Sequence, residues 1–164
     1  MQLVVADTSP LNYLILIDQI EILPALFEKV LVPEVVRNEL QHSDAPAAVR
    51  RWISTTPPWL EIVPAGQETT DVELLRLGGG ERAAILLALR IKAELLLIDD
   101  RDGVNLARSR GFAVTGTFGI LDLAASRGVI DLHEAVKRLK VTTFRYPPDM
   151  LDELLARHSR QNRL

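Results

Sequence analysis

The chain has 164 residues, of which 48% are hydrophobic and 25% charged, and its formal net charge at pH 7 is −3. This length suits one domain with a hydrophobic core. The absence of cysteine excludes disulfides and thiolate metal sites, and the three histidines are scattered, so a bound metal would have oxygen ligands, as Mg²⁺ or Mn²⁺ prefer. We find no apolar run of transmembrane length and no signal peptide, so we expect a cytoplasmic protein without membrane contact.

Short apolar runs alternate with helical patterns along the chain, which predicts an α/β fold with a mainly parallel sheet. The predicted strands are Leu3–Ala6, Val30–Val32, Leu60–Val63, Leu95–Ile98 and Phe112–Val114. The predicted helices are Pro10–Ile17, Ile22–Glu28, Pro33–Gln41, Ala47–Ile53, Thr70–Leu77, Glu81–Lys92, Gly103–Arg110, Phe118–Arg127, Leu132–Lys140 and Pro148–His158. No linker is long enough to divide the chain, so we expect a single domain over residues 1–164.

Asp7 follows the first predicted strand directly. Ser9 and Pro10 suit the cap and first turn of the next helix, which leaves the Asp7 carboxylate without a capping role. The carboxyl edge of a parallel sheet is where ligands bind in open α/β folds. Asp7 is therefore either a site residue or a turn residue.

Glu39 and Glu81 lie on two predicted helices. Glu39 shares the face of Val35 and Val36, so it is either a site residue or a stripe-edge residue with a solvated head. Glu81 opens its helix, where the helix dipole also favours a carboxylate without any function.

Asp99 and Asp100 end the apolar run that begins at Leu95. Side chains alternate across a strand, so the two carboxylates point in different directions, and one of them can cap the following helix while the other stays free. Several carboxylates gathered at one place repel one another, and a divalent cation relieves that repulsion. Such a cation can activate water for phosphodiester hydrolysis.

Four segments in this order resemble the PIN-domain nuclease superfamily, and within it the small stand-alone prokaryotic proteins. They are "VVADTSPLNYL", "VLVPEVVRNEL", "LGGGERAAILLAL" and "LLLIDDRDGVNLARSRGFAVTGTFGIL". The resemblance covers about residues 1–130. It implies a Rossmann-like, three-layer α/β/α fold with an acidic site for Mg²⁺ or Mn²⁺, and the cleavage of RNA in many members.

The resemblance also implies site residues, with Asp7, Glu39, Glu81 and Asp100 as the catalytic acids. The same four are metal ligands together with Asp99, because the extra acid leaves open which of the pair faces the metal. Thr8 and Ser9 are expected to orient these groups, and Arg82 and Arg101 are expected to contact substrate phosphates, although surface solubility explains both arginines as well.

Many small prokaryotic PIN proteins are toxins of toxin–antitoxin pairs. The resemblance therefore implies a metal-dependent endoribonuclease acting on single-stranded or structured RNA, held inactive by a small antitoxin protein and forming a homodimer. The helices from about residue 130 would serve as cover or as a dimer element. The alternative is a catalytically silent PIN-like binding module in a complex.

Overall fold

The computed structural model describes residues 2–161 and is built around five short parallel strands. Their spatial order is β3-β2-β1-β4-β5. The strands are β1 (Val4–Ala6), β2 (Val30–Pro33), β3 (Leu60–Val63), β4 (Leu95–Leu97) and β5 (Val114–Thr115). Each strand was predicted from the sequence, including β3, which forms despite the prolines around it.

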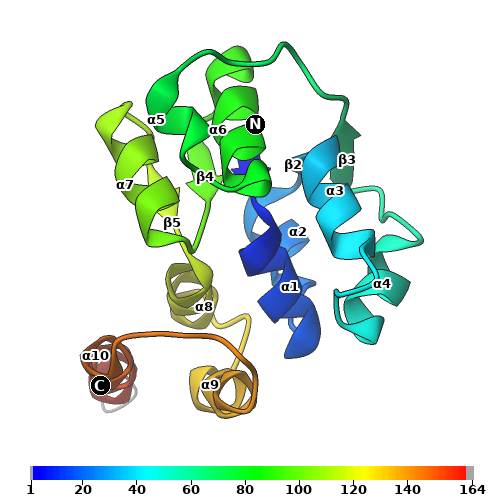
Figure 1. The fold of residues 1–164 in the computed structure, drawn as a ribbon. Coiled ribbons are helices and arrows are strands. Elements are labelled where there is room, and N and C mark those ends of the chain that lie inside the picture. Colours follow the sequence, from blue (N-terminus) through cyan, green and yellow to red (C-terminus); the bar gives the residue numbers. More distant parts are fainter. Residues whose placement is uncertain (1, 162–164) are drawn as a thin grey trace.

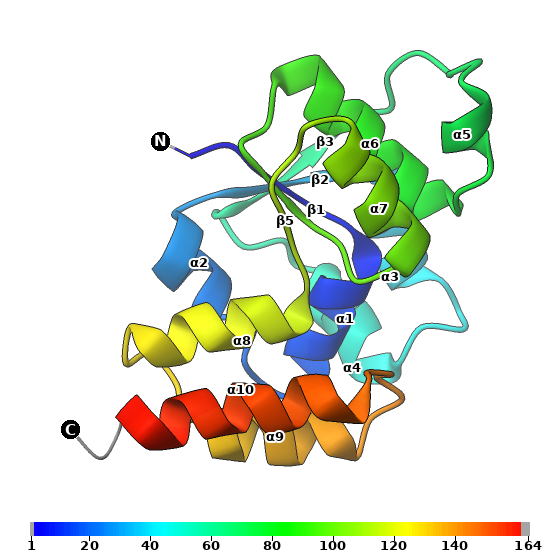
Figure 2. The same ribbon diagram turned by 90° about the vertical axis from the view of Figure 1, so that its left-hand side faces the viewer.

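Helices cover both faces of this sheet, so the fold is a three-layer α/β/α arrangement, as predicted (Figures 1 and 2). Figure 2 shows the sheet between α6 and α7 on one side and α1, α2 and α8 on the other. The helices are α1 (Thr8–Leu16), α2 (Ile22–Phe27), α3 (Glu34–Gln41), α4 (Ala47–Ile53), α5 (Val72–Leu75), α6 (Gly79–Ile91), α7 (Arg101–Ser109), α8 (Thr117–Ser126), α9 (Leu132–Lys140) and α10 (Pro148–Gln161).

The two faces of the sheet belong to two hydrophobic clusters, as the alternation of side chains along a strand requires. Val4 and Ala6 of β1 pack with the helices on the α1 side, whereas Val5 between them packs with α6 and α7. Such fully covered strands are typical of parallel sheets. The last two helices pack against α8 and against each other, away from the sheet (Figure 2).

The sequence-based prediction for the start of α1 was wrong. The helix begins at Thr8, so Asp7 occupies the cap position that was assigned to Ser9, and Pro10 is the third residue of the first turn. The Asp7 carboxylate makes no capping hydrogen bond. No helix among residues 2–161 has the length and apolar character needed to cross a membrane.

Candidate active site

The site lies at the carboxyl edge of the sheet, where the chain leaves β1, β4 and β5 and enters helices. β1 is the central strand, with β2 on one side and β4 on the other. The connections therefore reverse direction beside β1, and ligands bind at such switch points in open α/β sheets. Asp7, Asp99 and Thr117 follow these three strands closely.

Asp7 is fully buried, and neither of its carboxylate oxygens has a hydrogen-bond partner among residues 2–161. Its backbone N–H donates to the Leu97 carbonyl at 2.9 Å, which ties the end of β1 to β4. A buried carboxylate without donors is costly, and a bound cation is one of the few ways to offset that cost.

The surroundings of Asp7 disfavour its charge. Burial raises the pKa of Asp7 to about 8, and the negative charge of Glu81 adds to the rise. The charges of Glu39 and Asp99 act in the same direction, and the Thr8 amide offsets only part of the effect. Three other predicted site carboxylates thus lie within electrostatic range of Asp7.

Glu39 reaches this site from α3. Its side chain is exposed, unlike Val36 and Leu40 of the same helix, yet its carboxylate accepts a hydrogen bond from the Thr8 hydroxyl. The prediction that Glu39 shares an inward face with Val35 and Val36 does not match its exposure, although its carboxylate contacts Thr8 of α1.

Glycine at position 80 leaves space between two of the carboxylates. A Cβ atom on Gly80 would lie 2.5 Å from Glu39 Oε2 and 2.7 Å from Asp7 Oδ1, too close for either contact. The carboxylates of α3 and β1 thus converge on one point beside α6. A side chain at this position would displace the head of Glu39 or the buried carboxylate of Asp7.

Glu81 is in the first turn of α6 and is half-buried. A Cβ on Gly103 of α7 would lie 3.4 Å from Glu81 Cγ, so the stem of Glu81 packs where α6 and α7 meet. Its Oε2 atom lies beside Gly78, which precedes α6. α6 covers the face of the sheet opposite to α1, and from there the charge of Glu81 helps to raise the pKa of Asp7.

The structure separates the roles of Asp99 and Asp100. Asp99 Oδ2 accepts hydrogen bonds from the hydroxyls of Thr117 at 2.7 Å and Ser9 at 2.9 Å, and its Oδ1 accepts from the Thr117 amide at 2.7 Å. Burial raises the pKa of Asp99, and these donors oppose the rise. Asp99 is thereby held in one orientation beside Asp7.

Asp100 caps α7 instead. Its side chain accepts from the Gly103 amide at 2.9 Å and is exposed. The resemblance matched Asp100 to the motif acid, whereas the residue of the pair that acts electrostatically on Asp7 is Asp99. Strand alternation explains the difference, because consecutive side chains at the end of β4 point to opposite sides.

The other predicted residues lie around this centre. Thr8 and Ser9 bind Glu39 and Asp99, which are the orienting contacts expected of them. Arg82 is half-buried on α6, and Arg101 is exposed at the start of α7. Among residues 2–161, no three His, Asp or Glu side chains are placed so that all three could coordinate one metal ion.

Two residues of the site were not found by sequence reasoning. Thr117 was placed near a helix start without a role, although it follows a strand at the ligand-binding edge, and that position is a usable signal. Gly80 lies between the predicted helices Thr70–Leu77 and Glu81–Lys92, and the sequence alone indicated no role for it. The reason for a glycine is visible only in the structure, where the carboxylates of Glu39 and Asp7 come close to position 80.

Comparison with known proteins identifies the family. A model of the PIN domain matches residues 3–160. A solved structure of similar fold is a PilT N-terminus domain protein from the hyperthermophilic archaeon Sulfolobus solfataricus P2, with a TM-score of 0.51 and 15% identity over 89% of this chain and 100% of that one. No curated protein matches. Because the family model spans nearly the whole sequence, the chain belongs to the PIN-domain family.

Proposed function

We propose that this protein is a metal-dependent endoribonuclease. PIN domains are usually nucleases and generally use divalent metal ions. The observation that carries the proposal is Asp7, a fully buried carboxylate that lacks any hydrogen-bond partner and is surrounded by further acids. A structural acid would be capped or paired, whereas this one is left for a ligand.

The residues present fit a hard divalent cation. Asp7 and Glu39 converge beside Gly80 and would hold Mg²⁺ or Mn²⁺ through oxygen atoms, with Asp99 and Glu81 close to Asp7. Mg²⁺ commonly binds one or two protein carboxylates and keeps several of its waters. A site among residues 2–161 that offers fewer than three preformed carboxylate ligands is therefore compatible with Mg²⁺. A bound cation of this kind supplies water of lowered pKa and stabilises charge on a phosphate.

The protein's own groups have positioning roles in this proposal. Thr117 and Ser9 hold Asp99 in place, and Thr8 holds the head of Glu39. Groups that hold metal ligands in position matter for metal affinity and activity, and their loss typically costs about 10- to 100-fold. Arg82 and Arg101 would contact substrate phosphates. Hydrolysis adds water across the P–O3′ bond and leaves a 5′-phosphate and a 3′-hydroxyl.

The experiment that tests this function is cleavage of a mixed pool of structured and unstructured RNA by the purified protein. It is run with Mg²⁺, with Mn²⁺ and with EDTA, beside an Asp7→Asn variant and an Asp100→Asn control. We expect cutting that needs metal, is lost with Asp7→Asn and persists with Asp100→Asn. Binding of RNA without cutting in any metal would instead support the silent binding module.

The toxin role and the partners rest on the resemblance alone. Under this proposal, expression of the wild-type chain without its antitoxin arrests bacterial growth, whereas expression of Asp7→Asn does not. Light scattering of the purified protein tests the homodimer. Normal growth despite strong expression of a soluble, RNA-cleaving protein would refute the toxin role and leave the nuclease function standing.

A further inference from the structure

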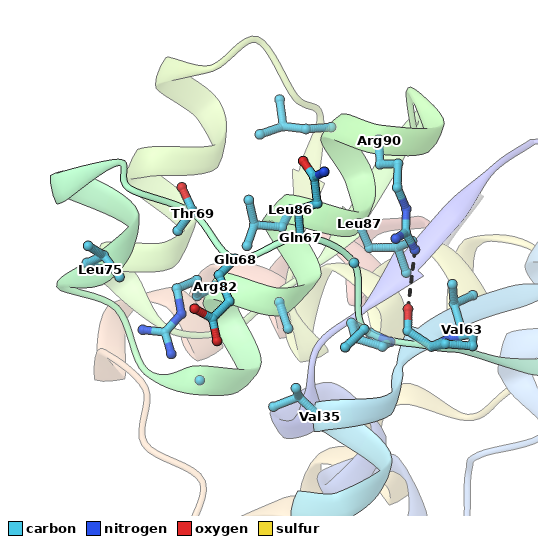
Figure 3. Close-up of a pocket in the computed structure, with 17 residues that line it drawn as sticks. Val35, Val63, Gln67, Glu68, Thr69, Leu75, Arg82, Leu86, Leu87 and Arg90 are labelled. Carbon is cyan, nitrogen blue, oxygen red and sulfur yellow. Dashed lines mark hydrogen bonds between the residues drawn. The ribbon is translucent and has the colours of Figure 1, made fainter.

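A groove with a volume of about 980 Å³ lies beside α6, and Figure 3 shows the side chains that line it. Its walls are α6, the beginning of α3 and the chain that continues from β3 through residues 63–69. Its volume is at the upper end of the range for ligand-binding pockets, so it has room for more than one nucleobase.

The wall that α6 contributes is mainly apolar. Gly79, Ala83, Leu86 and Leu87 line it at the spacing of one helical face, and Leu89 lies beside them. Leu89 is 42% exposed, and Leu75 across the groove is 51% exposed. The outer face of a surface helix is usually polar, so an apolar groove here indicates a surface that binds something.

Two arginines accompany this apolar wall. Figure 3 shows Arg82 and Arg90 at opposite ends of the groove. Among the described residues neither forms an ion pair; Arg82 donates to the Leu77 carbonyl and Arg90 to the Pro64 carbonyl, both at 3.4 Å. Within the described part of the chain, Glu68 alone lines the groove with a carboxylate, and it is exposed.

The groove is continuous with the acidic site through Gly79. A Cβ atom on Gly79 would lie 3.7 Å from Val35 Cγ1 and 3.9 Å from Glu39 Oε1, and both Gly79 and Val35 line the groove. A ligand in the groove would therefore extend toward Glu39. Arg82 lies one helical turn from that opening, and Arg90 lies eight residues further along α6, or about 12 Å.

We propose that this groove binds an unpaired strand of nucleic acid on one side of the phosphate to be cleaved; the inference rests on the proposed function. Arg82 and Arg90 bind phosphates, and the apolar wall accepts base faces. A duplex hides its base faces, so the apolar wall favours a single strand.

The test measures the binding of labelled oligo(U) and oligo(dT), each about 12 nucleotides long. Fluorescence anisotropy gives the affinity over a range of salt concentrations. Ca²⁺ replaces Mg²⁺ and Mn²⁺, since it also takes oxygen ligands, and a gel checks that the probe stays intact. The variants are Arg82→Gln, Arg90→Gln and Leu89→Glu. Arg51→Gln, an exposed arginine of α4, is the matched control.

We expect each arginine variant to weaken binding and to reduce the slope of log K against log[salt] by about 0.7, the value for one phosphate contact in a single strand. Leu89→Glu should weaken binding because it adds a negative charge and removes an apolar contact. Arg51→Gln should change neither the affinity nor the salt slope. Equal binding of oligo(U) and oligo(dT) indicates phosphate and base contacts alone, whereas preference for oligo(U) indicates an additional contact to the ribose 2′-hydroxyl.

Three results would overturn the proposal: no binding by the wild-type chain, a slope unchanged by both arginine variants, or the same loss with Arg51→Gln. Binding of an acidic amphipathic peptide that depends on Arg82 and Arg90, without binding of either oligonucleotide, would make the groove a protein-docking site instead. If the oligonucleotides bind through the groove but the wild-type chain cleaves RNA with neither Mg²⁺ nor Mn²⁺, the nuclease function alone is refuted. If the wild-type chain cleaves RNA but the groove variants bind the oligonucleotides as tightly as it does, the groove proposal alone is refuted.

Discussion

Thr117 donates both its backbone amide and its hydroxyl to the carboxylate of Asp99, each at 2.7 Å. Thr117 is itself fully buried and follows β5, while Asp99 follows β4. The contact therefore joins the ends of two neighbouring strands and fixes a carboxylate beside Asp7. A carboxylate oriented in this way loses little freedom when it binds a ligand.

Replacing Thr117 by valine tests this positioning role. Thr117→Val removes the hydroxyl but keeps the amide and the side-chain shape, so the protein should fold while Mn²⁺ affinity falls by about 10- to 100-fold. Titration calorimetry measures the affinity. Thr143→Val, which removes a hydroxyl that contacts Tyr13 rather than an acid of the site, is the control and should leave the affinity unchanged. Equal affinities in both variants would contradict the role.

Asp99 and Asp100 give a matched pair of neighbouring substitutions. Asp99→Asn should lower the rate of RNA cleavage by about 100-fold or more, because it removes a charge beside Asp7. Asp100→Asn should keep the rate within about threefold, since asparagine also caps helices well. Single-turnover cleavage assays compare the two. A larger loss of cleavage rate for Asp100→Asn than for Asp99→Asn would show that the site uses Asp100 instead of Asp99.

Gly79 and Gly80 give a second matched pair. Gly80→Ala places a Cβ 2.5 Å from Glu39 Oε2 and 2.7 Å from Asp7 Oδ1, so it should abolish Mn²⁺ binding and cleavage. Gly79→Ala makes only ordinary contacts, at 3.7 Å or more, and should keep both metal binding and cleavage. Thermal unfolding confirms that both variants fold. Intact metal binding by Gly80→Ala would contradict the geometry described for the two acids.

The stability of the metal-free protein should depend on pH through Asp7. Its pKa is about 8 in the folded protein, against an ordinary value of 3.8. Between these values the folded protein keeps a proton that the unfolded chain has lost. The free energy of unfolding should therefore fall as the pH rises from about 4 to 8. Chemical denaturation in EDTA measures this fall, and it should be much smaller in Asp7→Asn.

Metal binding should show the opposite dependence on pH. Below about pH 8 a cation must displace the Asp7 proton, so Mn²⁺ affinity should rise by about tenfold per pH unit and level off above that value. Calorimetry in buffers of different ionisation enthalpy measures the released proton. An affinity that does not vary between pH 6 and 8 would indicate that the cation binds elsewhere.

Much of the fold could be predicted because it depends on local patterns. The five strands and the order of strands and helices follow from apolar runs and helical periodicity, and β3 and α9 have the predicted bounds. The start of α1 could not be predicted so well. Ser9 and Pro10 are good local signals for a helix start, but the helix begins at Thr8, directly after the Asp7 N–H pairs with the Leu97 carbonyl of the neighbouring strand.

The site was predictable in its residue types and less so in its geometry. The strand-end and helix-face positions pointed to Asp7, Glu39 and Glu81, and the charges of both glutamates act on Asp7. The orientation of Asp99 depends on Thr117, which is 18 residues away in the chain. Such long-range contacts leave little trace in local sequence.

The most direct test of the account is a calorimetric titration of Mn²⁺ into the metal-free wild-type chain and into Asp7→Asn, both checked for folding by circular dichroism. We predict binding by the wild-type chain and a loss of at least about 100-fold in affinity for Asp7→Asn, because Asp7 is the carboxylate without any other partner. Equal affinities for the two proteins, or no binding by the folded wild-type chain, would contradict the assignment of Asp7 as a metal ligand.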